Sequence, residues 1–109
     1  MGAKYKKKTD PELLRQIDSA ADNNEYIQAV FSLALPTKKL LDPQQVEETT
    51  NQVLHRAEEE VGSKPSDVNI FKNMGSFVIS ADASFIQKVI DDPDVASAIA
   101  NKKGKALLK

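Results

Sequence analysis

The sequence predicts an α+β domain of the ferredoxin-like type, a split βαβ plait in which an antiparallel sheet carries its helices on one face. Three observations lead to this prediction. Apolar and polar residues alternate from Glu25 to Leu35, a stripe of helical period runs between Asp42 and Gly62, and Asp67 to Asn101 follows the pattern strand, turn, strand, helix, strand. The resulting order βαββαβ, preceded by an extra N-terminal helix, is typical of that plait.

The length of 109 residues allows one domain with a single modest core. Hydrophobic residues make up 40% and charged residues 28%, as in an ordinary globular protein. We expect three segments: a basic tail and helix over residues 1–24, the ferredoxin-like domain over 25–101, and a basic tail over 102–109.

The first helix is predicted to begin at Asp10-Pro11-Glu12, where an acceptor side chain is followed by proline and an acid in the first turn. It should end near Asn24 and pack at the edge of the main fold. Residues 1–8 are predicted to be disordered. The apolar stripe of this helix consists of Leu13, Leu14, Ile17 and Ala21.

The segment Glu25 to Leu35 has the clearest strand pattern, and Pro36 ends it. One side is more apolar than the other, which predicts a sheet covered on one side only. The more apolar side carries Ile27, Ala29, Phe31, Leu33 and Leu35.

The second helix has strong start and stop signals. Asp42 can cap it, Pro43 suits its first position, and Gln45 stands where a capping box needs it. Leu41 would pack on Val46 as a hydrophobic staple, and Gly62 favours the left-handed conformation of a helix end. Its predicted buried stripe is Val46, Thr50, Val53, Leu54, Ala57 and Val61.

The last third predicts a hairpin that turns at Asn73-Met74-Gly75, with Phe77, Ile79 and Ala81 facing the helices. Asp82 can cap a short helix, which Asp92-Pro93 ends. Residues 95–100 are expected to form the last strand. A helix over residues 94–103 is the alternative, because alanines favour it.

The residues offer no catalytic machinery, and we expect neither an enzyme nor a bound cofactor or metal. The chain has no cysteine, and its one histidine, His55, lies in a helix and is expected to be partly exposed. Glu58-Glu59-Glu60 point in different directions on a helix. Asp91-Asp92-Pro93-Asp94 could bind calcium weakly, but it lacks the twelve-residue loop pattern and is explained by a helix-ending turn.

Charge argues against nucleic acid as a partner. Eight lysines lie in the two tails, which leaves seven basic residues against all sixteen acids in the body between Asp10 and Asp94. An acidic body repels a duplex. RNA-recognition modules share the plait, but the likeness of Gly75-Ser76-Phe77-Val78 to their strand motif is poor because Phe77 faces the helices. No segment is long and apolar enough to span a membrane or act as a secretory signal, so cytoplasmic is the default localisation.

Phe77 to Asn101 carries a phenylalanine at the start of a central strand, the exit Ser80-Ala81-Asp82, a short helix with Ile86, Val89 and Ile90, and Pro93-Asp94-Val95 before the last strand. This segment resembles the propeptides of subtilisin-like serine proteases and the related free-standing inhibitors. The resemblance extends to Glu25 but is specific only over the last 25 residues. It implies a protease inhibitor or folding chaperone that acts in trans.

In that family the open side of the sheet lies against the protease and the C-terminal tail enters the active-site cleft. The pattern predicts an outward side with Tyr26, Val30, Phe71, Val78, Ala96 and Ala98. By the resemblance, Ala106, Leu107, Leu108 and Lys109 would lie in the cleft, with Lys109 next to the scissile bond; a disordered tail is the alternative. The leading helix departs from the family. The outward side could instead bind another protein, form a homodimer or be covered by the leading helix.

Overall fold

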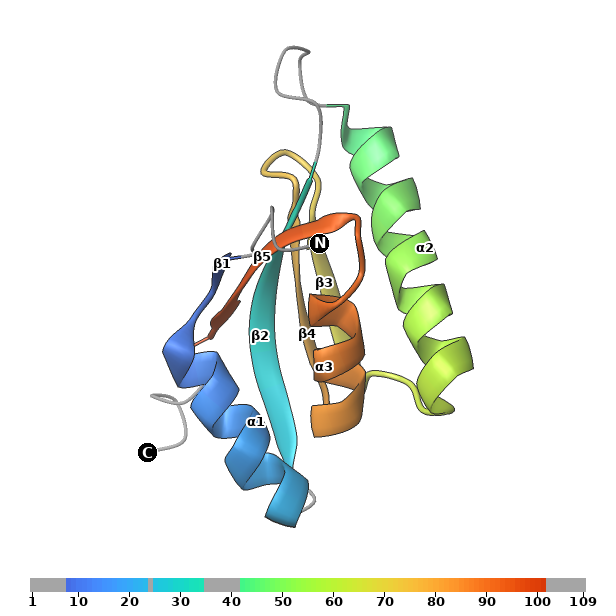
Figure 1. Ribbon diagram of the computed structural model, residues 1–109. Helices are drawn as coiled ribbons and strands as arrows, with labels where there is room; N and C mark the ends of the chain where they lie inside the picture. The colour runs from blue at the N-terminus through green and yellow to red at the C-terminus, as the bar shows by residue number, and fades with distance from the viewer. Residues whose placement is uncertain (1–7, 24, 35–41, 102–109) are drawn as a thin grey trace, which may run out of the picture.

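The computed structural model describes residues 8–23, 25–34 and 42–101, which form an α+β structure (Figure 1). The extra N-terminal helix, the hairpin and the final strand are all present, so the alternative of a C-terminal helix is wrong. In chain order the elements are β1 (Lys8–Thr9), α1 (Pro11–Asn23), β2 (Tyr26–Leu33), α2 (Pro43–Val61), β3 (Asp67–Phe71), β4 (Ser76–Asp82), α3 (Ala83–Ile90) and β5 (Val95–Ala100).

The strands form one sheet in the order β1-β5-β2-β4-β3. The four longer strands are antiparallel to their neighbours, and the two-residue β1 adds a parallel strand at the β5 edge. The longest ladder joins β2 to β4, from Tyr26 opposite Asp82 to Ser32 opposite Ser76. The two central strands are therefore remote in sequence, and the hairpin partner β3 lies at the edge.

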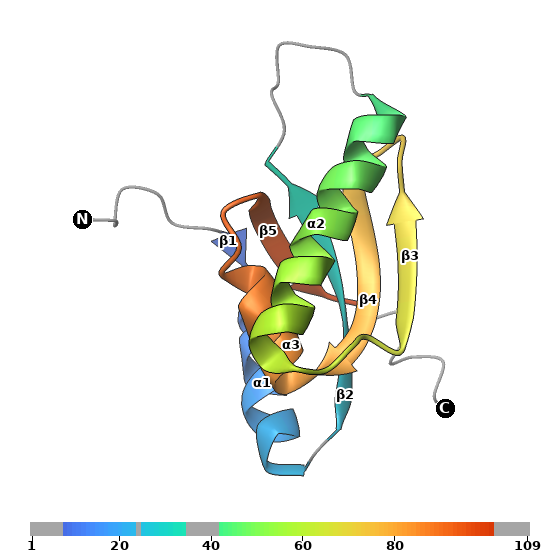
Figure 2. The same cartoon turned by 90° about the vertical axis from the view of Figure 1, so that its right-hand side faces the viewer.

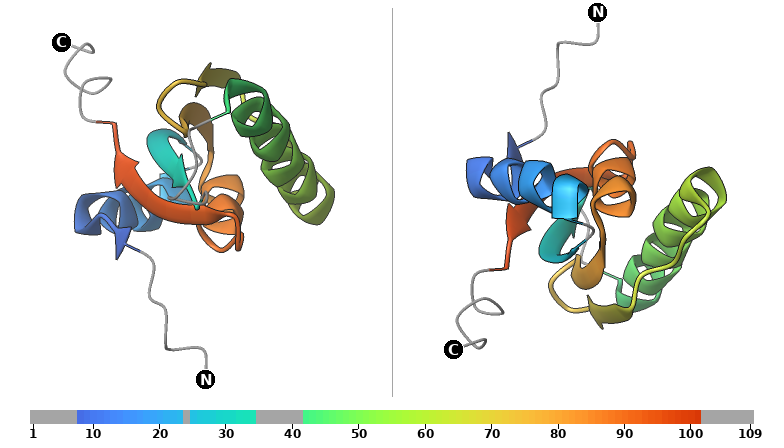
Figure 3. Two further views of the ribbon diagram at one scale, coloured as in Figure 1. Left: turned by 90° about the horizontal axis from the view of Figure 1, so that it is seen from above. Right: turned by 90° about the horizontal axis from the view of Figure 1, so that it is seen from below.

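All three helices cover the same face of the sheet, as the views in Figures 2 and 3 show. The side chains that point from β2, β4 and β5 into this layer are buried, whereas Val68 of the edge strand β3 is 42% exposed. The rings of Phe31 and Phe77 stack at the centre of the layer with centroids 5.2 Å apart. The helices contribute fully buried side chains such as Val46, Val53 and Phe85. We call this side of the sheet the covered face and the other side the open face.

The predicted caps are present where the structure describes them. The carboxylate of Asp42 accepts a hydrogen bond from the Gln44 amide at 3.1 Å, and that of Asp82 accepts one from the Phe85 amide at 2.8 Å. Gly62 ends α2 with φ of 83°, and its amide donates to the Glu58 carbonyl at 2.8 Å. Side-chain capping therefore sets the start of both helices. Leu41, the proposed staple, lies outside the described residues.

Helix α1 differs from the prediction in two respects. It packs against β5, β2 and α3 on the covered face rather than at the edge of the fold, and Leu13 is fully buried there. Its buried stripe is Leu13, Ile17 and Ala20, whereas Leu14 is 45% exposed. The helix also leaves the open face uncovered, so the alternative that it folds across that face is wrong. Lys8, predicted to be disordered, belongs to β1, and residues 1–7 lie outside the described residues.

The last strand has the predicted phase at Val95 and Ala96 and the opposite phase beyond them. The register between β2 and β5 shifts at Ser32 and Leu33, so that Ser97 pairs with Ser32 but Val95 pairs with Leu33. Such a bulge reverses the side-chain alternation beyond it. Ala98, predicted to face outward, is therefore buried at 1% exposure, and its neighbour Ile99 points outward at 49%.

Candidate functional site

The open face carries a row of aliphatic side chains at its centre. Val78 of β4 lies opposite Val30 of β2, and Val30 lies opposite Ile99 of β5. Asn69 of β3 continues the row beyond Val78. Val30 and Val78 are partly exposed and Ile99 is half exposed, because none of the described helices covers this side. We call Val30, Val78 and Ile99 the aliphatic row.

Two rows of neutral polar side chains flank the aliphatic row. On one side, cross-strand pairing aligns Ser76 with Ser32 and Ser32 with Ser97. On the other side, the amide of Gln28 donates to the Ser80 hydroxyl at 3.3 Å, and the amide of Asn101 donates to the Gln28 side-chain oxygen at 2.8 Å. These two bonds link the side chains of Ser80, Gln28 and Asn101 across the sheet. The centre of the open face therefore carries no formal charge over β2, β4 and β5.

Two aromatic side chains extend this surface along the strands. Tyr26, at the start of β2, is 56% exposed, and Phe71, at the end of β3, is 38% exposed. Both lie on the open side by the alternation of their strands. Met74 in the hairpin turn is 74% exposed and lies beyond Phe71 in the chain. The open face thus carries the aliphatic row across the middle of its strands, with a neutral polar row on each side. Phe71 lies at the β3 end of the serine row, and Tyr26 lies beyond Gln28 on β2.

Most of the predicted outward residues lie on this face, and one does not. Tyr26, Val30, Phe71 and Val78 share it, and Ala96 is exposed at the bulge. Ala98 points into the covered face, for the reason given above. Ile99 was missed, since strict alternation from Val95 places it inside. The tail residues Ala106, Leu107, Leu108 and Lys109 lie outside the described residues.

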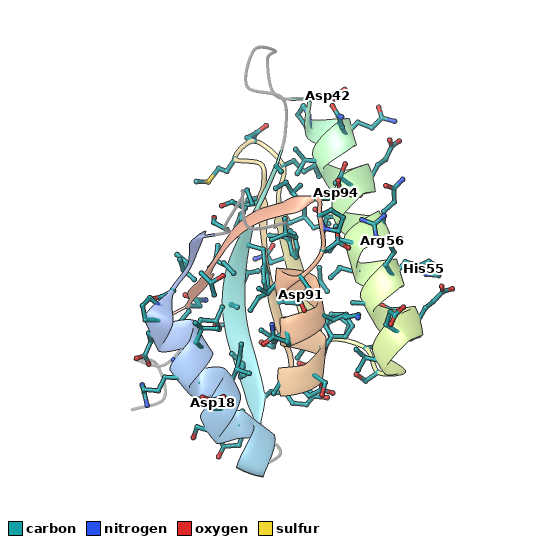
Figure 4. All side chains as sticks on the ribbon, in the orientation of Figure 1. Asp18, Asp42, His55, Arg56, Asp91 and Asp94 are labelled. Atoms are coloured by element: carbon teal, nitrogen blue, oxygen red, sulfur yellow. The ribbon has the colours of Figure 1, made fainter. Side chains whose placement is uncertain are left out.

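A charged cluster joins α2 to the connection between α3 and β5 (Figure 4). The guanidinium of Arg56 donates to both carboxylate oxygens of Asp92, at 3.0 and 2.9 Å, and to Asp94 at 2.7 Å. The hydrogen bond with Asp92, then that with Asp94, raises the pKa of Arg56. Asp92 is only 8% exposed and also accepts from the Asp94 amide. Arg56 thus holds two packed elements together.

This cluster changes the interpretation of the aspartate run from Asp91 to Asp94. Asp92 and Asp94 bind Arg56, which occupies the oxygens that a calcium ion would need. The part of the chain that the structure describes contains no group of three or more side chains placed to hold a metal ion. No local sequence pattern indicates the role of Arg56, because its partner Asp92 lies 36 residues away.

His55 lies on the solvent side of α2, with a 68% exposed side chain whose Nε2 is 3.1 Å from the Glu59 carboxylate (Figure 4). A hollow of about 460 Å³ lies between α1 and the Tyr26 end of β2, lined mainly by polar side chains such as Gln16, Ser19 and Gln28. His55 is not among the residues that line it. These features bring together no nucleophile and base within the described residues.

No described helix has the length and apolar character needed to cross a bilayer. Comparisons with protein-family models, with curated proteins and with solved structures find no match to this chain. The open face is the strongest functional candidate on geometric grounds.

Proposed function

We propose that this chain is a non-enzymatic protein-binding module that docks a partner on the open face of a ferredoxin-like plait. Two features support the assignment of the plait: the order β5-β2-β4-β3 within the run β2-α2-β3-β4-α3-β5, and the position of all helices on one face.

The single observation that carries the binding proposal is the exposed aliphatic row within a neutral border. Cores of protein interfaces are depleted in charged residues, whereas ordinary surface is rich in them. This chain has 28% charged residues, yet the row of Val30, Val78 and Ile99 and its flanking serines, Gln28 and Asn101 contain none. A partner that covers the aliphatic row and its neutral border would remove apolar surface from water without desolvating an ion.

The specific form of the proposal is an inhibitor or folding chaperone of a subtilisin-like serine protease in trans. The resemblance of Phe77 to Asn101 to protease propeptides motivates it. The position of Asn101 supports it, because this last described residue is bonded to Gln28 on the open face. The eight residues that follow, 102–109, span at most about 26–29 Å when extended, which sets the greatest distance from Asn101 at which a cleft could be occupied.

The mechanism would be occlusion. The open face docks, the tail occupies the cleft, and the stability of the folded plait limits cleavage because proteolysis needs local opening of the chain. A tightly packed covered face with the Phe31 and Phe77 stack favours slow opening.

The first test incubates the full-length protein with a subtilisin and follows hydrolysis of a chromogenic peptide together with the integrity of the chain. We expect the intact chain to slow hydrolysis in a saturable manner. Ile99→Asp should weaken inhibition at least tenfold, whereas Gln52→Asp, on an exposed position of α2, should leave it unchanged. Rapid digestion of the wild-type chain without any slowing of hydrolysis would refute the protease proposal.

A second test addresses the tail. Deletion of Ala106 to Lys109 should weaken inhibition far more than it lowers the free energy of unfolding, since the proposal places these residues in the protease cleft. If inhibition and the free energy of unfolding fall to the same degree, the proposed role of the tail is wrong. The docking surface is tested independently by Ile99→Asp.

A second copy of this chain is the alternative occupant of the open face. The absence of charge in its centre favours this, because two copies would not repel each other there. Light scattering would then show a dimer that Val30→Asp abolishes.

A further inference from the structure

The two edges of the sheet differ in whether the outward backbone groups have hydrogen-bond partners. At the β5 edge, β1 pairs in parallel with Ser97 and Ala98, and the Asp10 amide donates to the Ala98 carbonyl at 2.9 Å. The Asp10 carboxylate then accepts from the Ala100 amide at 3.1 Å. Backbone and side-chain groups of residues 8–10 thus seal the outer edge of β5.

The outer edge of β3 has no such cover. β3 is the last strand in the sheet order, and none of the described strands or helices pairs with its outer side (Figure 2). A strand of five residues therefore presents unpaired backbone groups to water. Its side chains at Val68 and Phe71 are 42% and 38% exposed.

Natural edge strands usually carry a device that prevents pairing, such as a lysine, a proline or a bulge in the strand. The segment Asp67-Val68-Asn69-Ile70-Phe71 contains no lysine or proline, and its pairing with β4 runs from Asp67 to Phe71 without a register shift. The one charged side chain is that of Asp67, at the first position. The edge is therefore open, regular and largely uncharged.

We propose that β3 pairs with β3 of a second copy, antiparallel about a two-fold axis at Asn69, so that two sheets join into one. This register overlaps all five residues and is self-complementary. Val68 lies beside Ile70 of the partner subunit, and Asp67 lies beside Phe71 of the partner subunit. No like charges face each other within the strand, since Asp67 meets an aromatic ring.

Pairing of this kind adds backbone hydrogen bonds along the outer edge of β3 and leaves the aliphatic row uncovered. Because the two-fold axis is perpendicular to the sheet, both open faces remain on the same side. The inference does not rest on the proposed function: the outward backbone groups of β3 are separate from the aliphatic row, and a protease could dock on each open face of the dimer.

A cysteine at position 69 gives the sharpest test, because the natural chain contains none. Opposed residues of an antiparallel pair have Cα atoms about 4.5–5.5 Å apart, which lies within the range that a disulfide spans. Asn69→Cys should form a covalent dimer under mild oxidation, at least tenfold faster than Ile99→Cys on the open face. Equal crosslinking rates for the two variants would overturn the proposal.

A charge-swap experiment tests the same axis without a covalent bond. Sedimentation of the wild-type chain at concentrations up to about 1 mM should show reversible dimerisation, because weak associations have dissociation constants up to that range. Asn69→Lys and Asn69→Asp should each be monomeric, since each places like charges opposite themselves. An equimolar mixture of the two should recover the dimer.

Circular dichroism of each variant at position 69 checks that the monomer is folded. A wild-type chain that is monomeric throughout, or a dimer that survives in both charged variants and is lost in Ile99→Asp, would overturn the edge proposal. Ile99→Asp is expected to keep the edge dimer and to lose protease inhibition, so failure of the edge and failure of the proposed function give different results.

Discussion

Strand β2 shows the contrast between the two faces of the sheet within eight residues. Its covered side carries Ile27, Ala29, Phe31 and Leu33, none more than 8% exposed, whereas the intervening residues from Tyr26 to Ser32 are all partly or largely exposed. Burial of apolar side chains against three helices accounts for the first set. The apolar members of the second set gain much less from folding. Their contribution to stability can therefore be measured separately from any contribution to binding.

Truncation of a ring at the centre of the covered face should have the largest effect. Phe31→Ala removes the stack with Phe77 from a fully buried site and should lower the free energy of unfolding by about 3–5 kcal/mol. Val30→Ala, the adjacent residue on the open face, should cost about 1 kcal/mol or less. Urea denaturation monitored by circular dichroism measures both.

A comparable loss in the two variants would contradict the contrast between the faces, because it would mean that Val30 is packed as tightly as Phe31. The ratio of the two losses in free energy of unfolding therefore measures how much more tightly the covered face is packed than the open face.

Removal of Arg56 tests how the helical layer is held over the covered face. Arg56→Ala leaves the buried Asp92 carboxylate without its bidentate partner, and we expect a loss of about 1–2 kcal/mol, reduced from that of a fully buried pair because Arg56 is half exposed. Arg15→Ala, which breaks an exposed pair with Glu12 on α1, is the matched control and should have a smaller effect.

The pH dependence of the Arg56 contribution follows from the raised pKa of this side chain. A pKa that is higher in the folded state adds stability that is complete below the pKa of the unfolded chain and is lost only as the pH rises through the folded value. Since arginine titrates above about pH 12, protonation of Arg56 should contribute equally from neutral to moderately alkaline pH. A stability difference between wild type and Arg56→Ala that falls between pH 7 and 10 would contradict this.

Local signals were sufficient to predict much of this molecule. The ends of the helices at Asp42, Gly62 and Asp82 were predictable because caps act within a few residues. The alternation in β2 and β4 correctly placed Phe31 and Phe77 on the covered face. The prediction failed where the decisive partner is distant in sequence. The bulge that turns Ala98 inward depends on how β5 registers with Ser32 and Leu33 of β2.

The same reason explains the missed charge cluster and the missed first strand. Arg56 meets Asp92 only after α2 packs on α3, and Lys8 and Thr9 join the sheet only because β5 offers its outer edge. Neither contact has a periodicity that a single sequence displays. For the candidate site, alternation predicted Val30 and Val78 but could not predict Ile99, whose orientation depends on the bulge.

At Thr50 we expect a substitution to raise the free energy of unfolding, by less than the losses expected at Phe31 and Arg56. The Thr50 hydroxyl is buried and has no hydrogen-bond partner within the described residues. Thr50→Val keeps the shape of the side chain and removes the unsatisfied oxygen, so it should raise the free energy of unfolding by about 1 kcal/mol. Thr49→Val, at the adjacent and more exposed position, should change it little. Thermal denaturation of the two variants compares them, and a loss of stability in Thr50→Val would indicate that the hydroxyl has a partner.

The smallest effect is expected on the open face itself. Ile99→Thr keeps a β-branched side chain in the strand and should alter the free energy of unfolding by no more than about 0.5 kcal/mol, because Ile99 is half exposed. Urea denaturation gives this value, and the inhibition assay gives the effect of the same variant on binding. If stability is unchanged and inhibition is weakened, Ile99 is needed for binding the partner and not for folding. The open face and the covered face would then have different roles. A loss of several kcal/mol would instead make Ile99 part of the core and remove the main argument for the open face as a binding surface.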